Sequence, residues 1–267
     1  MPKKINASTP STGTLVVPTP AETRQALFSE IERPGAPIRW SFLQAWGGKR
    51  PPGPARHFVH ERRLFALQLY LLVHLLALGK PWDAPTMPNE AWGRALDKIT
   101  AGAEATVSRS FGWLESKQLL KIDRTHQIRT AYLLREDGSG AAYKRRKGKY
   151  FTLPNDFFLE GHHNELSLNA TFSLLVALKH SVYRPWFKLV LEEGADWYGV
   201  SPDTLRRGLR ELAANGFIES ELRQERDVRA RYGVTRRHYY HLLGPYEWTT
   251  ASEAAMEGEE VDDAAAA

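Results

Sequence analysis

The feature that most constrains the fold is the segment from Leu191 to Ile218, near the C-terminal end of the chain. Gly199 can adopt the positive φ that a tight turn between helices requires. Ser201 can then cap the next helix, and Pro202 suits its first position because an N–H there has no intrahelical partner. Apolar residues recur at the spacing of one helix face, at Leu205, Leu209 and Leu212. The segment therefore predicts two helices joined by a tight turn, the second ending at Asn215-Gly216.

The polar side of the second helix is predicted to face the major groove of DNA. Its candidate contacts are Ser201, Asp203, Thr204, Arg206, Arg207 and Arg210. Such side chains near the start of the second helix of a helix-turn-helix reach base edges and phosphates. The alternative is an ordinary amphipathic helix with a solvated arginine face. DNA contact is favoured because the turn, the cap, the apolar positions and the strand starting at Phe217 stand at the spacing of a single motif.

Residues 191 to 243 resemble the winged-helix DNA-binding domains of bacterial regulators. The resemblance is carried by G-V-S-x2-T-L-x-R, which starts at Gly199, and by L-x3-L-x2-L-x3-G-F-I, which starts at Leu205. It implies a wing over 219 to 243 that would contact phosphates or the minor groove. The candidate wing contacts are Arg229, Arg231, Arg236 and Arg237, with Arg226 beside them.

An earlier copy of the same pattern lies 98 residues before the first one described. Its apolar positions are Val107, Phe111 and Leu114. T-V-S-R from Thr106 to Arg109 matches T-L-R-R from Thr204 to Arg207, and an apolar helix is predicted before each copy, over 61 to 78 and over 168 to 181. The chain is therefore predicted to be mainly α with small β-wings, an α+β fold of two tandem winged-helix domains.

The two copies differ in charge. Ser108 and Gly112 stand where the later copy has arginines, so Arg109 is the outward cation that remains in the earlier helix. Trp113 is predicted on the flank of that helix. The candidate DNA contacts here are Thr106, Ser108 and Arg109. We expect the second copy to supply most base readout and the first to add phosphate contacts, shape recognition or a protein interface.

The wing of the earlier copy is predicted over 121 to 153. A strand over 128 to 135, a turn over 137 to 140 and a returning strand over 150 to 153 would form it. The densest cation run of the chain precedes the returning strand, and its candidate DNA contacts are Lys144, Arg145, Arg146 and Lys147. The alternative is a solvated charge run that only aids solubility.

The remaining segments define the domain limits. Residues 1–22 are predicted as a disordered arm, 23–57 as an irregular connector that docks on the first domain, and 249–267 as an acidic disordered tail. The first winged-helix domain is placed at 58–153 and the second at 154–248. A short helix is expected over 23–31, and two others over 89–98 and 104–117.

Charge is distributed unevenly along the chain. The formal net charge is +5, but the last seventeen residues hold six acids and no Lys or Arg, so the rest of the chain carries +11. A body this basic is drawn to a polyanion, with an affinity that falls as salt is added. The acidic tail either screens the body from nonspecific DNA or only aids solubility.

The motifs expected of an enzyme or a cofactor-binding protein are missing. The chain has no cysteine, no Gly-rich phosphate-binding loop, no H-E-x-x-H and no G-x-S-x-G. We interpret His74 as a core residue, His162-His163 as unsuited to a tetrahedral metal site, and Tyr239-Tyr240 as packing residues rather than nucleophiles. We expect no enzyme activity, cofactor or metal, and a cytoplasmic protein, because no apolar run is long enough for a bilayer.

The expected function is sequence-specific binding of double-stranded DNA by a transcriptional regulator. The alternative is an initiator of plasmid or mobile-element replication, since such initiators also place two winged helices in one chain and bind tandem origin repeats. A third class is a protein-interaction module that uses Trp113 and the aromatic connector. Double-stranded DNA is the expected partner, a membrane is not, and a homodimer is left open. The composition, rich in Ala, Arg and Trp, favours a high-GC genome such as an actinobacterial one.

Overall fold

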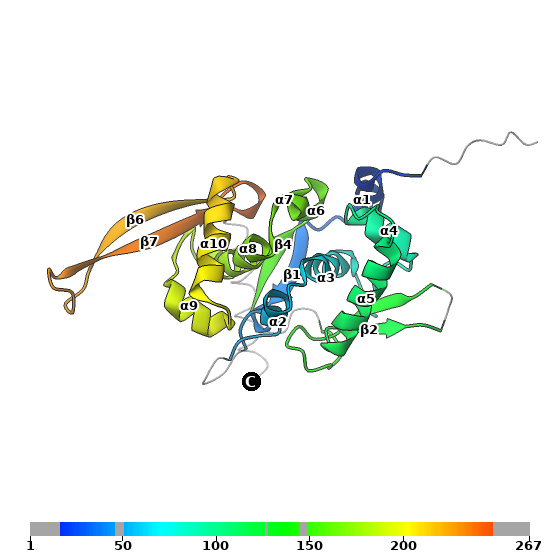
Figure 1. Ribbon diagram of the computed structural model, residues 1–267, viewed down its shortest axis with the longest axis horizontal. Helices are drawn as coiled ribbons and strands as arrows, with labels where there is room; N and C mark the ends of the chain where they lie inside the picture. The colour runs from blue at the N-terminus through cyan, green and yellow to red at the C-terminus, as the bar shows by residue number, and fades with distance from the viewer. Residues whose placement is uncertain (1–16, 46–50, 126–127, 145–148, 248–267) are drawn as a thin grey trace, which may run out of the picture.

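The computed structural model describes residues 17–45, 51–125, 128–144 and 149–247. These residues form a mixed α/β structure whose sheets are small and antiparallel. Figure 1 shows an elongated arrangement with one group of helices at each end, and a long ribbon of two strands extending from one of them. A two-stranded ladder and a short helix lie between the two groups.

The N-terminal group holds three helices and a hairpin. Its elements are α3 (Leu64–Leu76), α4 (Asn89–Ala95), α5 (Ala103–Ser116), β2 (Leu120–Asp123) and β3 (Thr130–Leu133). β3 pairs with β2 along one edge and, through a bridge between Tyr132 and Asp83, with residues 82–84 along the other. The Leu133 N–H donates to the Trp82 carbonyl at 2.9 Å. The strand that comes last in sequence is therefore the middle one.

The C-terminal group repeats this order of elements. It consists of α8 (Leu168–Ser181), β5 (Trp186–Lys188), α9 (Leu191–Tyr198), α10 (Pro202–Ala214), β6 (Ile218–Arg226) and β7 (Val234–Leu242). The strand order is β5-β7-β6, so again the last strand lies in the middle. Both groups thus run helix, edge segment, helix, helix, hairpin, and of these elements the sequence repeat predicts the helices.

The C-terminal ends of α5 and α10 have the same pattern of backbone hydrogen bonds. Leu119 and Phe217, 98 residues apart, each donate a backbone N–H to the carbonyl five residues earlier, at 3.1 and 2.9 Å. The residue before each donor is left-handed, with a φ of +57° at Gln118 and +76° at Gly216. This is the Schellman arrangement that ends helices. Gln118 therefore adopts a backbone conformation that is higher in free energy for a residue with a side chain than for glycine.

The remaining elements correct two predictions. They are α1 (Pro20–Phe28), β1 (Gly35–Arg39), the single-turn helix η1 (Trp40–Phe42), α2 (Ala55–His60) and β4 (Tyr150–Pro154). The connector predicted over 23–57 is therefore not irregular. The strand over 150–153 does not return to the earlier wing either, because β4 pairs with β1, from Gly35 opposite Pro154 to Arg39 opposite Tyr150.

Burial explains why β1 and β4 pair. In β1, Ala36 and Ile38 are buried, and in β4, Phe151 and Leu153 are buried, so both strands place their apolar residues in the core. The Pro- and Gly-rich residues around β1 hide this pattern in the sequence. The ladder packs against α3 through β1 and against α8 through β4. It therefore joins the two groups.

The other predicted helices are confirmed with shifted ends. The helix expected over 23–31 occupies 20–28, so α1 starts within the range assigned to the disordered arm, and α8 has the bounds predicted. The segment after β4 holds two short helices, α6 (Asp156–Leu159) and α7 (His162–Glu165), and η2 (Gly244–Tyr246) follows β7. Residues 1–16 of the predicted arm and all of the predicted tail lie outside the described residues.

An apolar core continues from one group into the other. α3 and α8 are its central helices, and both are buried over most of their length. Phe42, Phe58 and Tyr70 bring η1, α2 and α3 together, with ring centroids 5.1 to 6.2 Å apart. Within the described ranges, no helix combines the length and apolar character needed to cross a bilayer.

Candidate nucleic-acid interface

Helix α10 has an apolar face and a cationic face. The buried positions are Leu205, Gly208, Leu209 and Leu212. They pack against α8, and a Cβ at Gly208 would lie 2.1 Å from the Ser173 hydroxyl oxygen and 2.2 Å from the Asn169 carbonyl oxygen. The missing side chain therefore lets the two helices approach closely. This packing leaves the arginines of α10 on the solvent side.

The turn before α10 fixes where that helix begins. Gly199 is left-handed, with a φ of +64°, and the Ser201 side chain accepts the Thr204 N–H at 3.1 Å. The hydroxyl oxygens of Ser201 and Thr204 lie 2.9 Å apart. The predicted turn and cap are thus confirmed. Ser201 is exposed at a helix N-terminus, where the backbone dipoles favour an anion.

The cationic face of α10 carries three arginines and an aspartate. Asp203 pairs with Arg207 at 2.7 Å and with Arg206 at 3.5 Å, and the two arginine side chains are 68% and 46% exposed. Arg210, one turn further on, is exposed and forms no ion pair with any described residue. Exposed ion pairs are weak, so Arg206 and Arg207 can exchange Asp203 for a phosphate or a base edge.

The hairpin of β6 and β7 has two faces of unlike charge. On one face Glu221 pairs with Arg223 at 2.7 Å, and Glu225 pairs with Lys188 at 2.9 Å. The other face starts among core residues, with Ile218 opposite Leu242, and continues outward into solvent. Its exposed cations, which form no ion pair among the described residues, are Arg226 and Arg236.

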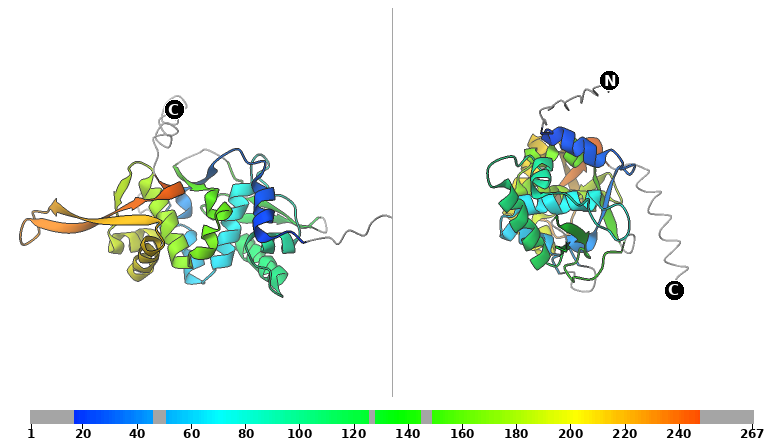
Figure 2. Two further views of the ribbon diagram at one scale, coloured as in Figure 1. Left: turned by 90° about the horizontal axis from the view of Figure 1, so that it is seen from above. Right: turned by 90° about the vertical axis from the view of Figure 1, so that its right-hand side faces the viewer.

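The end of this hairpin carries two more predicted contacts. Figures 1 and 2 show the hairpin extending far beyond the helices. Arg229 and Arg231 are exposed in its turn, where Asp227 accepts the Arg229 N–H at 2.9 Å and the Arg231 guanidinium lies 5.4 Å from the Tyr232 ring. Arg237 differs, because it is half-buried on the face where carboxylates balance the cations.

Helix α5 has a less charged face and a neighbour that sequence reasoning missed. Arg109 is exposed, and its guanidinium donates to the Thr106 hydroxyl at 3.4 Å. Ser108 accepts a hydrogen bond from Arg129 at 3.2 Å, and this guanidinium also lies 5.8 Å from the Phe111 ring. Arg129 belongs to the segment before β3, and no local pattern places it beside α5. It adds a cation to this unit.

Trp113 is committed to packing within the protein. Its indole N–H donates to Glu61 at 2.6 Å, and its ring lies edge to face against Phe58, with centroids 4.7 Å apart. Lys117 also pairs with Glu61, at 2.7 Å, and these two hydrogen bonds lower the pKa of the Glu61 carboxyl. Glu61 directly follows α2, so these contacts tie α2 to the C-terminal end of α5. They weaken the alternative of a protein interface built on Trp113.

The same short helix reaches the start of α10. The His60 Nε2 lies 2.7 Å from the Gly199 carbonyl oxygen, and a Cβ at Gly199 would lie 2.7 Å from the Pro52 ring. α2 and the residues just before it thus contact the end of α5 and the turn that precedes α10. In Figure 1 both helices face the viewer, with α5 descending from α4 and α10 rising from α9. Their relative position is set by α2 and by the shared core.

Part of the basic run in the earlier wing can be placed. Lys144 is exposed beside a pocket between β1 and the loop that follows β3. Arg145, Arg146 and Lys147 lie outside the described residues. The predicted strand before this loop is confirmed in part as β3, and the predicted turn contains the left-handed Gly138 and Gly140.

The three histidines singled out in the sequence lie in different surroundings. His74 is buried, which lowers its pKa to about 3. His162 and His163 face different partners, the Tyr246 hydroxyl at 2.8 Å and the Asp97 carboxylate at 3.0 Å. Over the described ranges, no group of three or more His, Cys, Asp or Glu residues could hold a metal ion.

The geometry therefore offers an exposed arginine row on α10, a cationic face on the adjoining hairpin, and a second, less charged helix, α5, in the other group of elements. Comparisons with protein-family models, curated proteins and solved structures found no match to this chain. The function is accordingly inferred from the residues themselves.

Proposed function

We propose that the chain binds double-stranded DNA through two tandem winged-helix units, one formed by each group of elements. In such a unit the last two helices form a helix-turn-helix and the hairpin forms the wing. The repeated order of elements supports this assignment, as does the identical ending of α5 and α10. The first unit would run from α3 to β3 and the second from α8 to β7.

The exposed arginine row of α10 is the observation that carries the proposal. An α-helix fits the major groove, where arginine binds guanine through two hydrogen bonds. Arg206, Arg207 and Arg210 share one face of α10, opposite the buried leucines, and are open to solvent. On the adjoining hairpin, Arg226 and Arg236 would neutralise phosphates further along the duplex.

A sequence-specific transcriptional regulator is the role we favour. Because α2 contacts α5 and the turn before α10, the two units would read one composite site with a fixed spacing. The richer arginine face of α10 supports base readout by the second unit, with phosphate contacts from Arg109 and Arg129 in the first. A replication initiator would use the same surface on an array of origin repeats.

Genomic pull-down sequencing followed by binding measurements tests this function. Fluorescence anisotropy on the recovered duplex should show affinity falling with salt, with a log–log slope of about −0.9 for each phosphate neutralised. Arg207→Ala should weaken binding to the recovered site by about 1–3 kcal/mol and make that binding less specific. Arg223→Ala, on the balanced face of the hairpin, is the control and should change little.

The recovered sites distinguish the two roles. Single sites upstream of genes support a regulator, whereas a cluster of direct repeats supports an initiator. Equal loss of specificity from Arg109→Ala and Arg207→Ala would contradict the division of work between the units. Absence of duplex binding even in dilute buffer would refute DNA binding altogether.

A further inference from the structure

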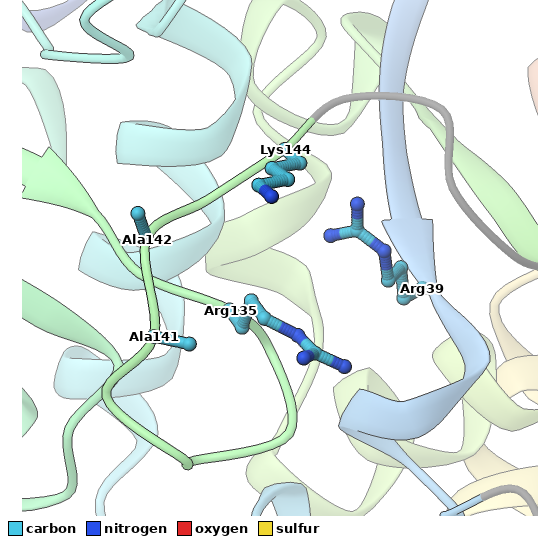
Figure 3. A pocket seen from close by; sticks show the side chains of 5 residues that line it. All are labelled: Arg39, Arg135, Ala141, Ala142 and Lys144. Atoms are coloured by element: carbon cyan, nitrogen blue, oxygen red, sulfur yellow. The ribbon is translucent and has the colours of Figure 1, made fainter.

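A pocket of about 400 Å³ lies between the end of β1 and the loop that follows β3. It is lined by Arg39, Arg135, Ala141, Ala142 and Lys144. Figure 3 shows the charged ends of Arg39 and Lys144 facing each other across the space, with Arg135 along one edge and the two alanines on the far side. Three cationic side chains, one from β1 and two from the loop after β3, therefore line one small volume.

The alanine wall of this pocket is held by backbone hydrogen bonds. The Arg135 N–H donates to the Ala141 carbonyl at 2.8 Å, and Leu134 bridges Ala142. Between them lies the turn with two left-handed glycines, in which the Ser139 N–H donates to Asp137 at 3.0 Å. The loop is thus a small closed hairpin, and the positions of Ala141 and Ala142 are defined relative to Arg135.

Arg39 is held in place by a buried carboxylate. Glu136 is 1% exposed, and it accepts the Arg39 side chain at 2.5 Å and the Arg39 backbone N–H at 3.3 Å. The Tyr143 ring lies 5.1 Å from the same guanidinium. Burial raises the pKa of Glu136, and the charge of Arg39 opposes this shift. The carboxylate is therefore covered by protein, while the guanidinium borders the pocket.

Positive charge exceeds negative charge around the pocket. Arg135 pairs with Asp137 at 2.9 Å, and Arg39 pairs with Glu136, but Lys144 forms no ion pair with a described residue. The Arg135 guanidinium has five N–H donors, so its pair with Asp137 leaves it able to bind a second anion. An anion that accepts hydrogen bonds from several sides suits these three cations. A phosphate group has this property, and arginine matches its geometry.

The size of the pocket indicates more than a bare inorganic ion. Small-molecule sites occupy about 300–1,000 Å³, and this pocket lies at the lower end of that range. The methyl groups of Ala141 and Ala142 provide an uncharged wall for the organic part of a ligand. A phosphate ester combines the anionic and the organic part in one molecule.

We propose that this pocket binds the phosphate group of a phosphate ester, with Arg39, Arg135 and Lys144 as its ligands and the two alanines against the organic part. The ester belongs either to a free nucleotide or to the backbone of DNA, which present the same group. The pocket is separate from the arginine row of α10 and does not depend on that row binding DNA.

The test uses the full chain with Lys144→Gln and Arg135→Gln, and with Lys121→Gln as the matched control. Lys121 is an exposed lysine on β2 outside the pocket. Arg39 is left unchanged because its loss would leave Glu136 buried without a partner. Circular dichroism and melting temperature should be the same for the control and for Lys144→Gln, since both side chains are exposed.

Two arms distinguish the sources of the phosphate. In the first, calorimetric titration with nucleoside mono-, di- and triphosphates and with inorganic phosphate measures free ligands. If the source is a nucleotide, at least one of the nucleotides should bind. Lys144→Gln and Arg135→Gln should each weaken the affinity for that nucleotide about tenfold or more. In the second, the salt dependence of duplex binding is measured. If the source is DNA, each pocket variant should reduce the log–log slope by about 0.9.

The outcomes separate this proposal from DNA binding by α10. Nucleotide binding that the pocket variants weaken, in a protein that binds no duplex, would support the pocket and refute the proposed function. Pocket variants that behave like Lys121→Gln in both arms would overturn the pocket, whatever α10 does. Binding of inorganic phosphate as tightly as any ester would contradict the role of the alanine wall.

Discussion

Gly208 sets how closely the candidate recognition helix approaches the core. Replacing it with alanine places a Cβ 2.1 Å from the Ser173 hydroxyl oxygen, so α10 must move away from α8. We expect Gly208→Ala to lower the free energy of unfolding by about 1–3 kcal/mol, as overpacked interiors do. Urea denaturation of the variant and the native chain measures this change in the free energy of unfolding.

A glycine in the other helix serves as the control. Gly112 is exposed on α5, and nothing lies within 4 Å of a Cβ built there. Gly112→Ala should therefore raise the free energy of unfolding by up to about 1 kcal/mol, the usual gain in helix propensity. A Gly208→Ala protein as stable as the native chain would show that α8 and α10 do not pack as closely as described.

Gln118 and Gly216 occupy equivalent left-handed positions and allow a paired prediction. Gln118→Gly relieves the strain of a side chain at a φ of +57° and should stabilise the protein by about 1 kcal/mol. Gly216→Ala imposes the same strain at +76° and should destabilise it by a similar amount. Thermal unfolding of both variants measures the two changes in stability. Changes of the same sign would mean that the two helix ends are not equivalent.

At the scale of elements, α2 couples the two candidate DNA-contacting helices. It reaches the turn before α10 through His60 and reaches α5 through Phe58, so one short helix bridges the two units. The two hairpins differ strongly, with four-residue strands in β2 and β3 and nine-residue strands in β6 and β7. The C-terminal unit therefore reaches further from the core, which fits its larger set of exposed arginines.

His60→Ala tests this coupling without any assumption about DNA. The side chain is exposed, so overall stability should change by about 1 kcal/mol or less. Loss of the contact with the Gly199 carbonyl should loosen the turn between α9 and α10. Hydrogen exchange of the peptides around that turn should become faster, whereas His238→Ala on the exposed hairpin should leave it unchanged. Unaltered hydrogen exchange of the turn between α9 and α10 in the His60→Ala protein would contradict the coupling role of α2.

At the scale of the whole molecule, the buried His74 and His163 and the half-buried His180 make stability depend on pH. Burial lowers the pKa of His74 and of His180 to about 3 and that of His163 to about 4. In the unfolded chain histidines titrate near 6.5. The unfolded state therefore takes up protons that the folded state excludes. The histidine contribution is complete above pH 6.5 and is lost as the pH falls from about 6.5 toward 4.

The expected loss is measurable by urea denaturation between pH 7.5 and 5. Each of these histidines should contribute a slope of up to about 1.4 kcal/mol per pH unit within that window. His74→Phe, which keeps an aromatic ring between Tyr70 and Tyr143, should make the slope shallower. His238→Phe, at an exposed position, should not. Equal slopes for both variants would contradict the burial of a neutral His74.

The sequence by itself determined the parts of the protein whose signals are local. The cap at Ser201, the turn at Gly199 and the apolar face of α10 each depend on residues close together in the chain, and all three are present in the structure. Helix periodicity, capping and left-handed glycine act within a few residues, so a sequence pattern is enough to predict them.

Only the tertiary structure decided which distant segments meet. β1 pairs with β4, Arg129 lies beside Ser108, and Arg39 faces Lys144 across a pocket. A strand gains its stability from the partner and the core that it packs against, so a Pro- and Gly-rich stretch can become a strand when a partner far along the chain covers it. The arginine row of α10, by contrast, could be predicted from the sequence. The spacing of its residues within one helix already places them on one face.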